Sequence, residues 1–135
     1  MRTILTILLL ILVIITSCHS YTCNNLPDTF SSVDEAIQNV KKSTFHFTDE
    51  IKISDSVSAW VPDMFSWITS ANYYSCDGGK GYFIYNTNRG TTYIRKGVPL
   101  EVWNGFKETS SKGHYFDRYI REKYSISLRL IQVKP

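Results

Sequence analysis

The sequence predicts an α+β domain in which a small antiparallel β-meander packs against two C-terminal helices, preceded by an N-terminal helix and strand. Two observations indicate this class. Between residues 67 and 95, segments rich in aromatic residues are separated by glycine-containing turns, which is typical of hairpin-connected strands. On either side, residues 32–42 and 98–124 repeat apolar side chains at helical spacing. A chain of 135 residues, 43% of them hydrophobic, can bury the core of one domain.

Residues 1–17 have the pattern of a secretory signal peptide, with Arg2 before an apolar run that ends in small residues. The run is shorter than the roughly 20 apolar residues of a membrane-spanning helix. Its end, Ile-Thr-Ser-Cys18, resembles the lipobox of bacterial lipoproteins, which implies a lipid-anchored chain beginning at Cys18. Cleavage near Ser20 is the alternative and would release a soluble protein. In both cases we expect an exported protein, in the periplasm or at a membrane surface.

The cysteine count agrees with export. Cys18 either carries the lipid or is removed with the leader, so that Cys23 and Cys76 remain. An even pair of cysteines in an oxidising compartment favours a disulfide, which here would join the N-terminal tail to the main domain. The alternative is two free thiols that do not meet.

Residues 18–31 contain turn-forming Asn, Pro and Asp without periodicity and are predicted to be a tether. A capping box, Ser32 followed by Glu35, then begins a helix predicted over residues 32–42. Residues 44–48 alternate polar and apolar side chains, which indicates a half-buried strand that Ile51 and Ile53 could extend.

Two features of this N-terminal extension, residues 32–65, bear on function. His46 points away from the apolar neighbours Phe45 and Phe47 in the predicted strand, so we expect it at the surface. Residues 54–66 are predicted to form an irregular loop with several large apolar side chains, which would either pack over the core or offer a contact surface.

The main domain is predicted over residues 66–135. Its meander consists of strands at residues 67–74, 81–87 and 91–95, joined by turns at 77–80 and 88–90.

Helices follow the meander and are expected to cover its apolar face. Pro99 suits the first position of a helix whose buried stripe includes Trp103 and Phe106. Gly113 is predicted to end this helix and act as a hinge before a second helix at residues 114–124. Alternation over residues 125–133 predicts a final strand.

Charge is divided unevenly along the chain. Residues 18–79 carry three basic and eight acidic side chains, a net charge of −5, whereas residues 80–135 carry eleven basic and four acidic ones, a net charge of +7. The C-terminal half therefore has a positive field that could attract phosphate, an anionic glycan or an acidic protein. A solvated basic face without any partner is the alternative interpretation.

Residues 66–124 resemble the KTSC domain, a small bacterial module that also occurs at the C terminus of some lysyl-tRNA synthetases. In place of the family's central Tyr-x-Tyr this chain has Tyr93-Ile94-Arg95, so the second aromatic residue is absent. The resemblance implies RNA binding as one candidate function, but an exported protein is not expected to meet RNA. The matching residues are Ser66, Ile68, Tyr73 or Tyr74, Gly90, Tyr93, Gly97, Val98, Pro99, Val102, Phe106, Ser111, Gly113, Tyr115, Phe116, Ile120 and Tyr124.

A candidate binding face combines aromatic and basic side chains of the hairpin with basic side chains of the last helix. This combination is used to hold single-stranded nucleic acid and other polyanions. Because amphipathic strands turn half of their side chains towards the core, only part of such a set can be exposed. The candidate residues are Tyr82, Tyr85, Tyr93, Arg95, Arg118, Arg121 and Lys123.

Catalysis has one candidate set, Cys76 with His114 and Asp117, the residue types of a thiol nucleophile, its base and an orienting carboxylate. Their spacing does not require them to meet, and a disulfide at Cys76 would remove the nucleophile. The histidines and cysteines also lack metal-ligand spacing, so no cofactor is predicted.

The sequence therefore favours a non-catalytic binding or interaction module at the cell envelope, attached to the membrane through a lipid on Cys18. An anionic glycan or an acidic protein surface is the expected partner. RNA or another polyanion is the alternative ligand, and a thiol-dependent hydrolase is the second alternative.

Overall fold

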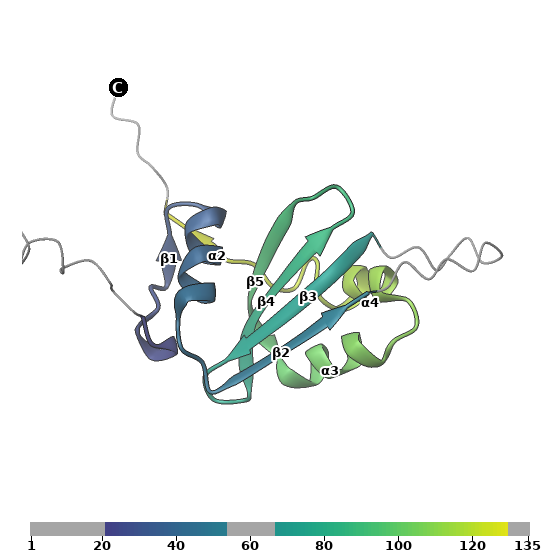
Figure 1. Ribbon diagram of the computed structural model, residues 1–135, viewed down its shortest axis with the longest axis horizontal. Helices are drawn as coiled ribbons and strands as arrows, with labels where there is room; N and C mark the ends of the chain where they lie inside the picture. Colours follow the sequence, from purple (N-terminus) through teal and green to yellow (C-terminus); the bar gives the residue numbers. More distant parts are fainter. Residues whose placement is uncertain (1–20, 54–66, 130–135) are drawn as a thin grey trace, which may run out of the picture.

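A computed structural model describes residues 21–53 and 67–129 and confirms the predicted α+β class (Figure 1). The predictions for Cys18, the leader, the loop at 54–66 and the last residues of the final strand lie outside these ranges. Within them, no helix is both long and apolar enough to cross a membrane. The elements are η1 (Cys23–Asn25), β1 (Thr29–Phe30), α2 (Val33–Lys42), β2 (Phe47–Lys52), β3 (Ile68–Ser75), β4 (Lys80–Thr87), β5 (Thr92–Pro99), α3 (Leu100–Glu108), α4 (Lys112–Tyr119) and β6 (Ser127–Leu128).

The main sheet has four antiparallel strands in the order β2-β3-β4-β5. The turn between β3 and β4 forms because the Asp77 carboxylate accepts the backbone N–H groups of Gly79 and Lys80, at 2.8 and 3.2 Å. Strand β5 is longer than predicted. It continues past a bulge at Gly97, whose φ of 79° only glycine adopts without strain, and this bulge returns Val98 to the core.

Strand β2 belongs to this sheet, where it pairs with β3 along its whole length, from Phe47 opposite Ser75 to Lys52 opposite Ser70. It begins later in the chain than the strand predicted at residues 44–48. The predicted boundary between the N-terminal extension (residues 32–65) and the main domain (residues 66–135) thus separates two hydrogen-bonded strands of one sheet.

Helices cover both faces of the sheet: α2 lies on one side and α3 with α4 on the other (Figure 1). Successive side chains of β4 alternate between the two cores. Tyr82 and Ile84 pack against α2, whereas Phe83 and Tyr85 pack against α3 and α4. All four side chains are buried, which explains why residues 82–85 of β4 form an uninterrupted apolar run in the sequence.

The N-terminal segment is fixed to the domain from Tyr21 onwards, which corrects the prediction of a tether reaching to residue 31. The backbone N–H of Thr44 donates to Tyr21, and that of Cys23 donates to Thr44. Phe30 is fully buried, and β1 pairs with β6 in parallel. The predicted capping box is confirmed, since the Ser32 hydroxyl accepts the N–H of Glu35 at 3.1 Å.

The C-terminal helices differ from the prediction at their ends. Pro99 is the N-cap of α3, so the helix begins one residue later. Gly113 is no helix stop: it is buried in the first turn of α4 and does not have a positive φ. Its lack of a side chain leaves room for Trp67, whose Nε1 atom would lie only 2.9 Å from an added Cβ. Helix α4 ends at Tyr119, before the predicted Tyr124.

One ionic contact joins β2 to α3. Asp49 Oδ2 accepts the indole N–H of the fully buried Trp103 at 2.9 Å and the ammonium group of Lys107 at 2.6 Å. The hydrogen bonds from Lys107 and then from Trp103 hold the pKa of the Asp49 carboxyl below its usual range.

We expect Asp49→Ala to lower the free energy of unfolding by about 1–3 kcal/mol at neutral pH, because it leaves a buried indole N–H without an acceptor. Since the folded pKa is depressed, the stabilisation is present above about pH 4 and is lost as the pH falls through the folded value. Urea unfolding across this pH range would check both points. A difference between wild type and variant that does not shrink in acid would contradict the assignment.

Candidate binding site

A hollow of about 430 Å³ lies where β4 turns into β5, on the face of the sheet that α4 covers. Three aromatic rings and two guanidinium groups line it, from Trp67, Tyr85, Tyr93, Arg89 and Arg121, together with the polar side chains of Thr87, Asn88 and Thr91. We call it the aromatic–arginine hollow. Its volume falls within the range of about 300–1,000 Å³ that is usual for small-ligand sites.

The sheet register places the aromatic side chains of this hollow. Tyr85 and Tyr93 are directly opposite on β4 and β5, and their rings stack with centroids 5.3 Å apart. Tyr85 is buried, whereas Tyr93 is 41% exposed, so the pair offers a ring face that rests on the core. The rings of Trp67 and Tyr85 pack edge to face with their centroids 5.9 Å apart. The backbone carbonyl of Trp67 accepts the backbone N–H of Asn88 at 2.9 Å.

The cations come from the hairpin turn and from the turn that follows α4. Arg121 lies over the Trp67 ring, with its guanidinium carbon 5.5 Å from the ring centroid, and it pairs with Asp117 at 2.8 Å. Arg89 lies in the turn between β4 and β5. The described residues that line the hollow include no carboxylate; Asp117 offsets the charge of Arg121 from outside the lining, and Arg89 leaves the hollow positive.

Arg95 stands beside the hollow, on the same face of the sheet as Tyr93. Its guanidinium carbon is 6.0 Å from the centroid of the Phe116 ring. Its Nε atom is buried and has no hydrogen-bond partner among the described residues. The resemblance to the KTSC domain implies a second tyrosine at the position of Arg95, so a cation stands where a ring is expected.

Burial raises the pKa of the Tyr85 hydroxyl, and the nearby positive charge of Arg95 opposes part of this rise. Tyr85 is therefore a neutral phenol at physiological pH and does not itself offset the positive charge of the arginines, of which Arg121 is paired with Asp117.

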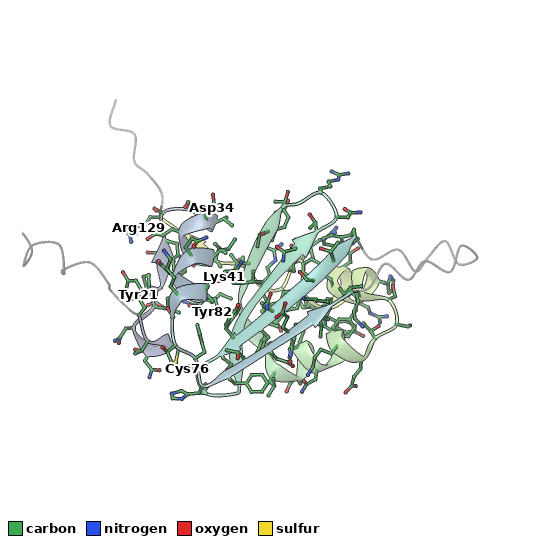
Figure 2. All side chains as sticks on the ribbon, viewed as in Figure 1. Tyr21, Asp34, Lys41, Cys76, Tyr82 and Arg129 are labelled. Carbon is green, nitrogen blue, oxygen red and sulfur yellow. A yellow bond between two sulfur atoms is a disulfide. The ribbon has the colours of Figure 1, made fainter. Side chains whose placement is uncertain are left out.

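The structure divides the candidate binding face predicted from sequence. Tyr85, Tyr93 and Arg121 meet in the hollow, with Arg95 next to it. Tyr82 is buried beneath α2 on the opposite face of the sheet, which excludes it from this surface (Figure 2). The remaining predicted residues, Arg118 and Lys123, lie against the exposed ring of Tyr119, at 5.5 and 5.4 Å, and do not line the hollow.

Two of the five aromatic and arginine residues of the hollow, Trp67 and Arg89, were not among the residues predicted from the sequence. Arg89 follows Asn88 in a turn, and a cation at a hairpin tip is ordinary for a solvated loop. Trp67 precedes β3 and matches the pattern of a core residue. The sequence contains one signal for this side of the sheet, the run Tyr93-Ile94-Arg95. The side chains of alternate residues in a strand share a face, so Tyr93 and Arg95 are expected on the same side.

A second site lies at the opposite end of the sheet. The predicted disulfide between Cys23 and Cys76 is present, with its Cα atoms 5.6 Å apart. The His46 side chain, exposed as predicted, has a ring nitrogen within 4.8 Å of both sulfur atoms. Spacing along the chain did not indicate this group, because three separate segments bring it together.

The predicted catalytic set is not assembled in this way. His114 and Asp117 belong to α4, whereas Cys76 lies across the sheet, below α2 (Figure 2). In the disulfide form, Cys76 also has no thiol with which to attack a substrate.

Gly113→Ala should lower the free energy of unfolding by about 1–3 kcal/mol, because the new methyl group would displace the Trp67 indole. The gain in helix propensity from replacing glycine offsets up to about 1 kcal/mol of this cost. Thermal unfolding followed by circular dichroism measures the effect. A stabilised Gly113→Ala protein would show that Trp67 does not need this space.

The fold and the hollow define a small α+β domain with a positively charged aromatic site at one end of its sheet. Residues 85–124 match the family model of the KTSC domain, which confirms the resemblance over this part of the chain. The match includes Tyr85, Arg89, Tyr93 and Arg121 of the hollow, but not Trp67. No curated protein and no solved structure matches the chain significantly.

Proposed function

We propose that this protein is a non-catalytic binding module of the cell envelope that holds an acidic glycan in the aromatic–arginine hollow. The observation that carries the proposal is the convergence of Trp67, Tyr93 and Arg121 on one hollow. Trp67 immediately precedes β3, Tyr93 belongs to β5 and Arg121 lies in the turn after α4, so the site exists only in the folded domain.

The chemistry of the hollow suits a ligand that combines a flat apolar face with an anionic group. A sugar ring presents C–H groups on one face, which pack on an exposed aromatic ring such as that of Tyr93. A uronate or other sugar carboxylate can accept a bidentate pair of hydrogen bonds from Arg121 or Arg89. Both arginines line the same hollow as the rings, so one ligand can reach both kinds of group.

Single-stranded RNA shares these two properties and is the second candidate ligand, since bases stack on aromatic rings and phosphates pair with arginine. The predicted leader favours the glycan, because an exported domain meets envelope polysaccharide rather than RNA. A lipid on Cys18 would hold the domain close to such polymers and raise their effective concentration.

Binding should be measured with an oligosaccharide of uronic acids, its neutral counterpart of equal length, and a single-stranded RNA. We expect the acidic oligosaccharide to bind, and Arg121→Gln to weaken its binding by about tenfold, the equivalent of one charge-assisted hydrogen bond. Tyr93→Ala should weaken binding by a similar factor by removing the exposed ring.

Arg129→Gln is the matched control. It removes the same charge from an exposed residue beside α2, on the other side of the molecule (Figure 2). An equal loss of affinity for the acidic oligosaccharide in Arg121→Gln and Arg129→Gln would show that binding depends on the overall charge and not on the hollow. Preferential binding of RNA would replace the glycan with the second candidate, and binding of neither polymer would refute both.

The anchor has a separate test, the intact mass of the protein purified from bacterial membranes without reductant. The proposal requires a chain that begins at Cys18 and carries acyl groups. A chain that retains Met1 would exclude export and leave the cytoplasm, where RNA is available, as the place of action.

A further inference from the structure

Three chain segments meet at the end of the sheet that lies below α2 (Figure 2). Cys76 follows β3 directly, and His46 precedes β2 directly. The β2–β3 register ends with Phe47 opposite Ser75, so the next residue of each segment, His46 and Cys76, lies at the same edge of the sheet.

The third segment is held there by main-chain hydrogen bonds as well as by the disulfide. Thr44 donates to the Tyr21 carbonyl at 3.1 Å, and Cys23 donates to the Thr44 carbonyl at 3.0 Å. These two bonds flank Thr22, which forms a parallel bridge with Thr44. Cys23 is therefore held beside the segment that leads into His46 by contacts that do not require the sulfur–sulfur bond.

The ligand atoms of Cys23, His46 and Cys76 all lie within 4.8 Å of one another. In a tetrahedral zinc site, Zn–S and Zn–N distances are about 2.3 and 2.0 Å, which puts neighbouring ligand atoms roughly 3.5–4 Å apart. Once the disulfide is opened, rotation of the cysteine side chains is enough to reach this spacing. We propose that the reduced protein binds a zinc ion through Cys23, Cys76 and His46, and that oxidation to the disulfide abolishes the site.

The chemistry balances with a dithiol as the reductant. The dithiol gives two electrons and two protons to the disulfide, which leaves two cysteine thiols and an oxidised reductant. Zinc then replaces the two thiol protons and takes the neutral imidazole as its third ligand. Cys23 and Cys76 are half-buried residues and His46 is exposed, so a water molecule can reach the fourth position. Two thiolates and one imidazole favour zinc over magnesium or calcium.

Asn24 is a further neighbour of Cys76, and its amide must turn its NH₂ group towards the sulfur once zinc has replaced the thiol proton. Its Oδ1 atom lies 2.9 Å from Cys76 Sγ, where it can accept a hydrogen bond from the reduced thiol. It is next to Cys23 in η1, so the same short helix positions both side chains.

The test is titration of the full-length protein with cobalt(II), which enters zinc sites and reports thiolate ligands by charge-transfer absorption, followed by competition with zinc. The protein is first reduced with a phosphine, which is then removed without oxygen. We expect one cobalt ion per reduced chain with thiolate absorption, displacement by zinc, and no binding to the oxidised chain. Circular dichroism and amide NMR spectra check that the reduced protein stays folded.

His46→Asn is the informative variant, because it keeps both cysteines and changes only an exposed side chain. It should weaken zinc binding by at least about 100-fold, since even residues that merely support zinc ligands are worth about 10- to 100-fold. His114→Asn, an exposed histidine on α4, is its matched control and should bind as the wild type does. A Cys23→Ser/Cys76→Ser double variant keeps Cys18 and should lose the thiolate absorption.

Four results would overturn the proposal. They are zinc affinity unchanged in His46→Asn, equal binding by oxidised and reduced chains, thiolate absorption that persists in the double cysteine variant, and loss of the fold on reduction with zinc present.

Discussion

Phe83→Ala is expected to lower the free energy of unfolding by about 3–5 kcal/mol, the usual cost of removing a fully buried ring. Phe83 is the centre of the core beneath α3 and α4. Its side chain has no exposed surface and its ring contacts those of Trp103, Phe106, Phe116 and Tyr85, at centroid distances of 5.0–6.0 Å. Small domains have only about 5–15 kcal/mol of total stability, so this variant should unfold at a much lower urea concentration.

Two further variants provide reference values for the loss of stability in Phe83→Ala. Phe83→Leu keeps most of the volume and should cost less than about 1.5 kcal/mol. Tyr119→Ala removes a ring that is 37% exposed and should cost less than Phe83→Ala. If Phe83→Ala were no worse than Tyr119→Ala, the core would not be centred on β4 as described.

Removing the disulfide should have a comparable effect. Cys23 and Cys76 are 53 residues apart, and closing a loop of this length restricts the unfolded chain by about 4 kcal/mol in the chain-entropy description. We expect Cys23→Ser/Cys76→Ser to lose about 2–4 kcal/mol, because hydrogen bonds at Thr44 retain the segment in part. Urea unfolding of the oxidised wild type and the double variant measures this difference.

The reduced wild type distinguishes the loss of the cross-link from the effect of the serines. It should match the double variant in the absence of metal. An oxidised protein that is no more stable than its reduced form would contradict the disulfide's role in fixing the N-terminal segment.

Local features of the fold could be predicted from the sequence because their causes are local. The cap of α2 depends on Ser32 and Glu35, three residues apart, and the β3–β4 turn depends on Asp77 accepting N–H groups of the next residues. Each has its own sequence signature, and both were confirmed.

Features set by distant contacts could not be predicted in the same way. On β4, the residues from Tyr82 to Tyr85 are all buried, so no polar–apolar alternation reveals which side chain faces which core. Sequence reasoning therefore placed Tyr82 and Tyr85 together on an exposed face, although they lie on opposite faces and are both buried. Gly113 resembled a helix stop, whereas its role depends on Trp67, which is distant in the chain.

The candidate site was predicted only in part, because some of its residues are brought together by contacts between distant parts of the chain. Tyr93 and Arg95 were identified because aromatic and basic side chains occur together in the predicted hairpin. Trp67 and Arg89 enter the hollow through strand pairing and a turn, which spacing along the chain does not encode. The Cys23–Cys76 pair was found by counting cysteines, but His46 joins it only through the β2–β3 register.

The most direct test of the proposed function is the NMR signal of the Trp67 indole N–H during titration with the uronic acid oligosaccharide. The fully buried Trp103, bonded to Asp49, is the internal reference, and Trp67→Phe assigns the signal. Binding in the aromatic–arginine hollow predicts a saturable shift of the Trp67 signal, little change at Trp103, and loss of the shift in Arg121→Gln. An unchanged Trp67 signal while the oligosaccharide binds would place the ligand elsewhere and contradict the hollow as the binding site.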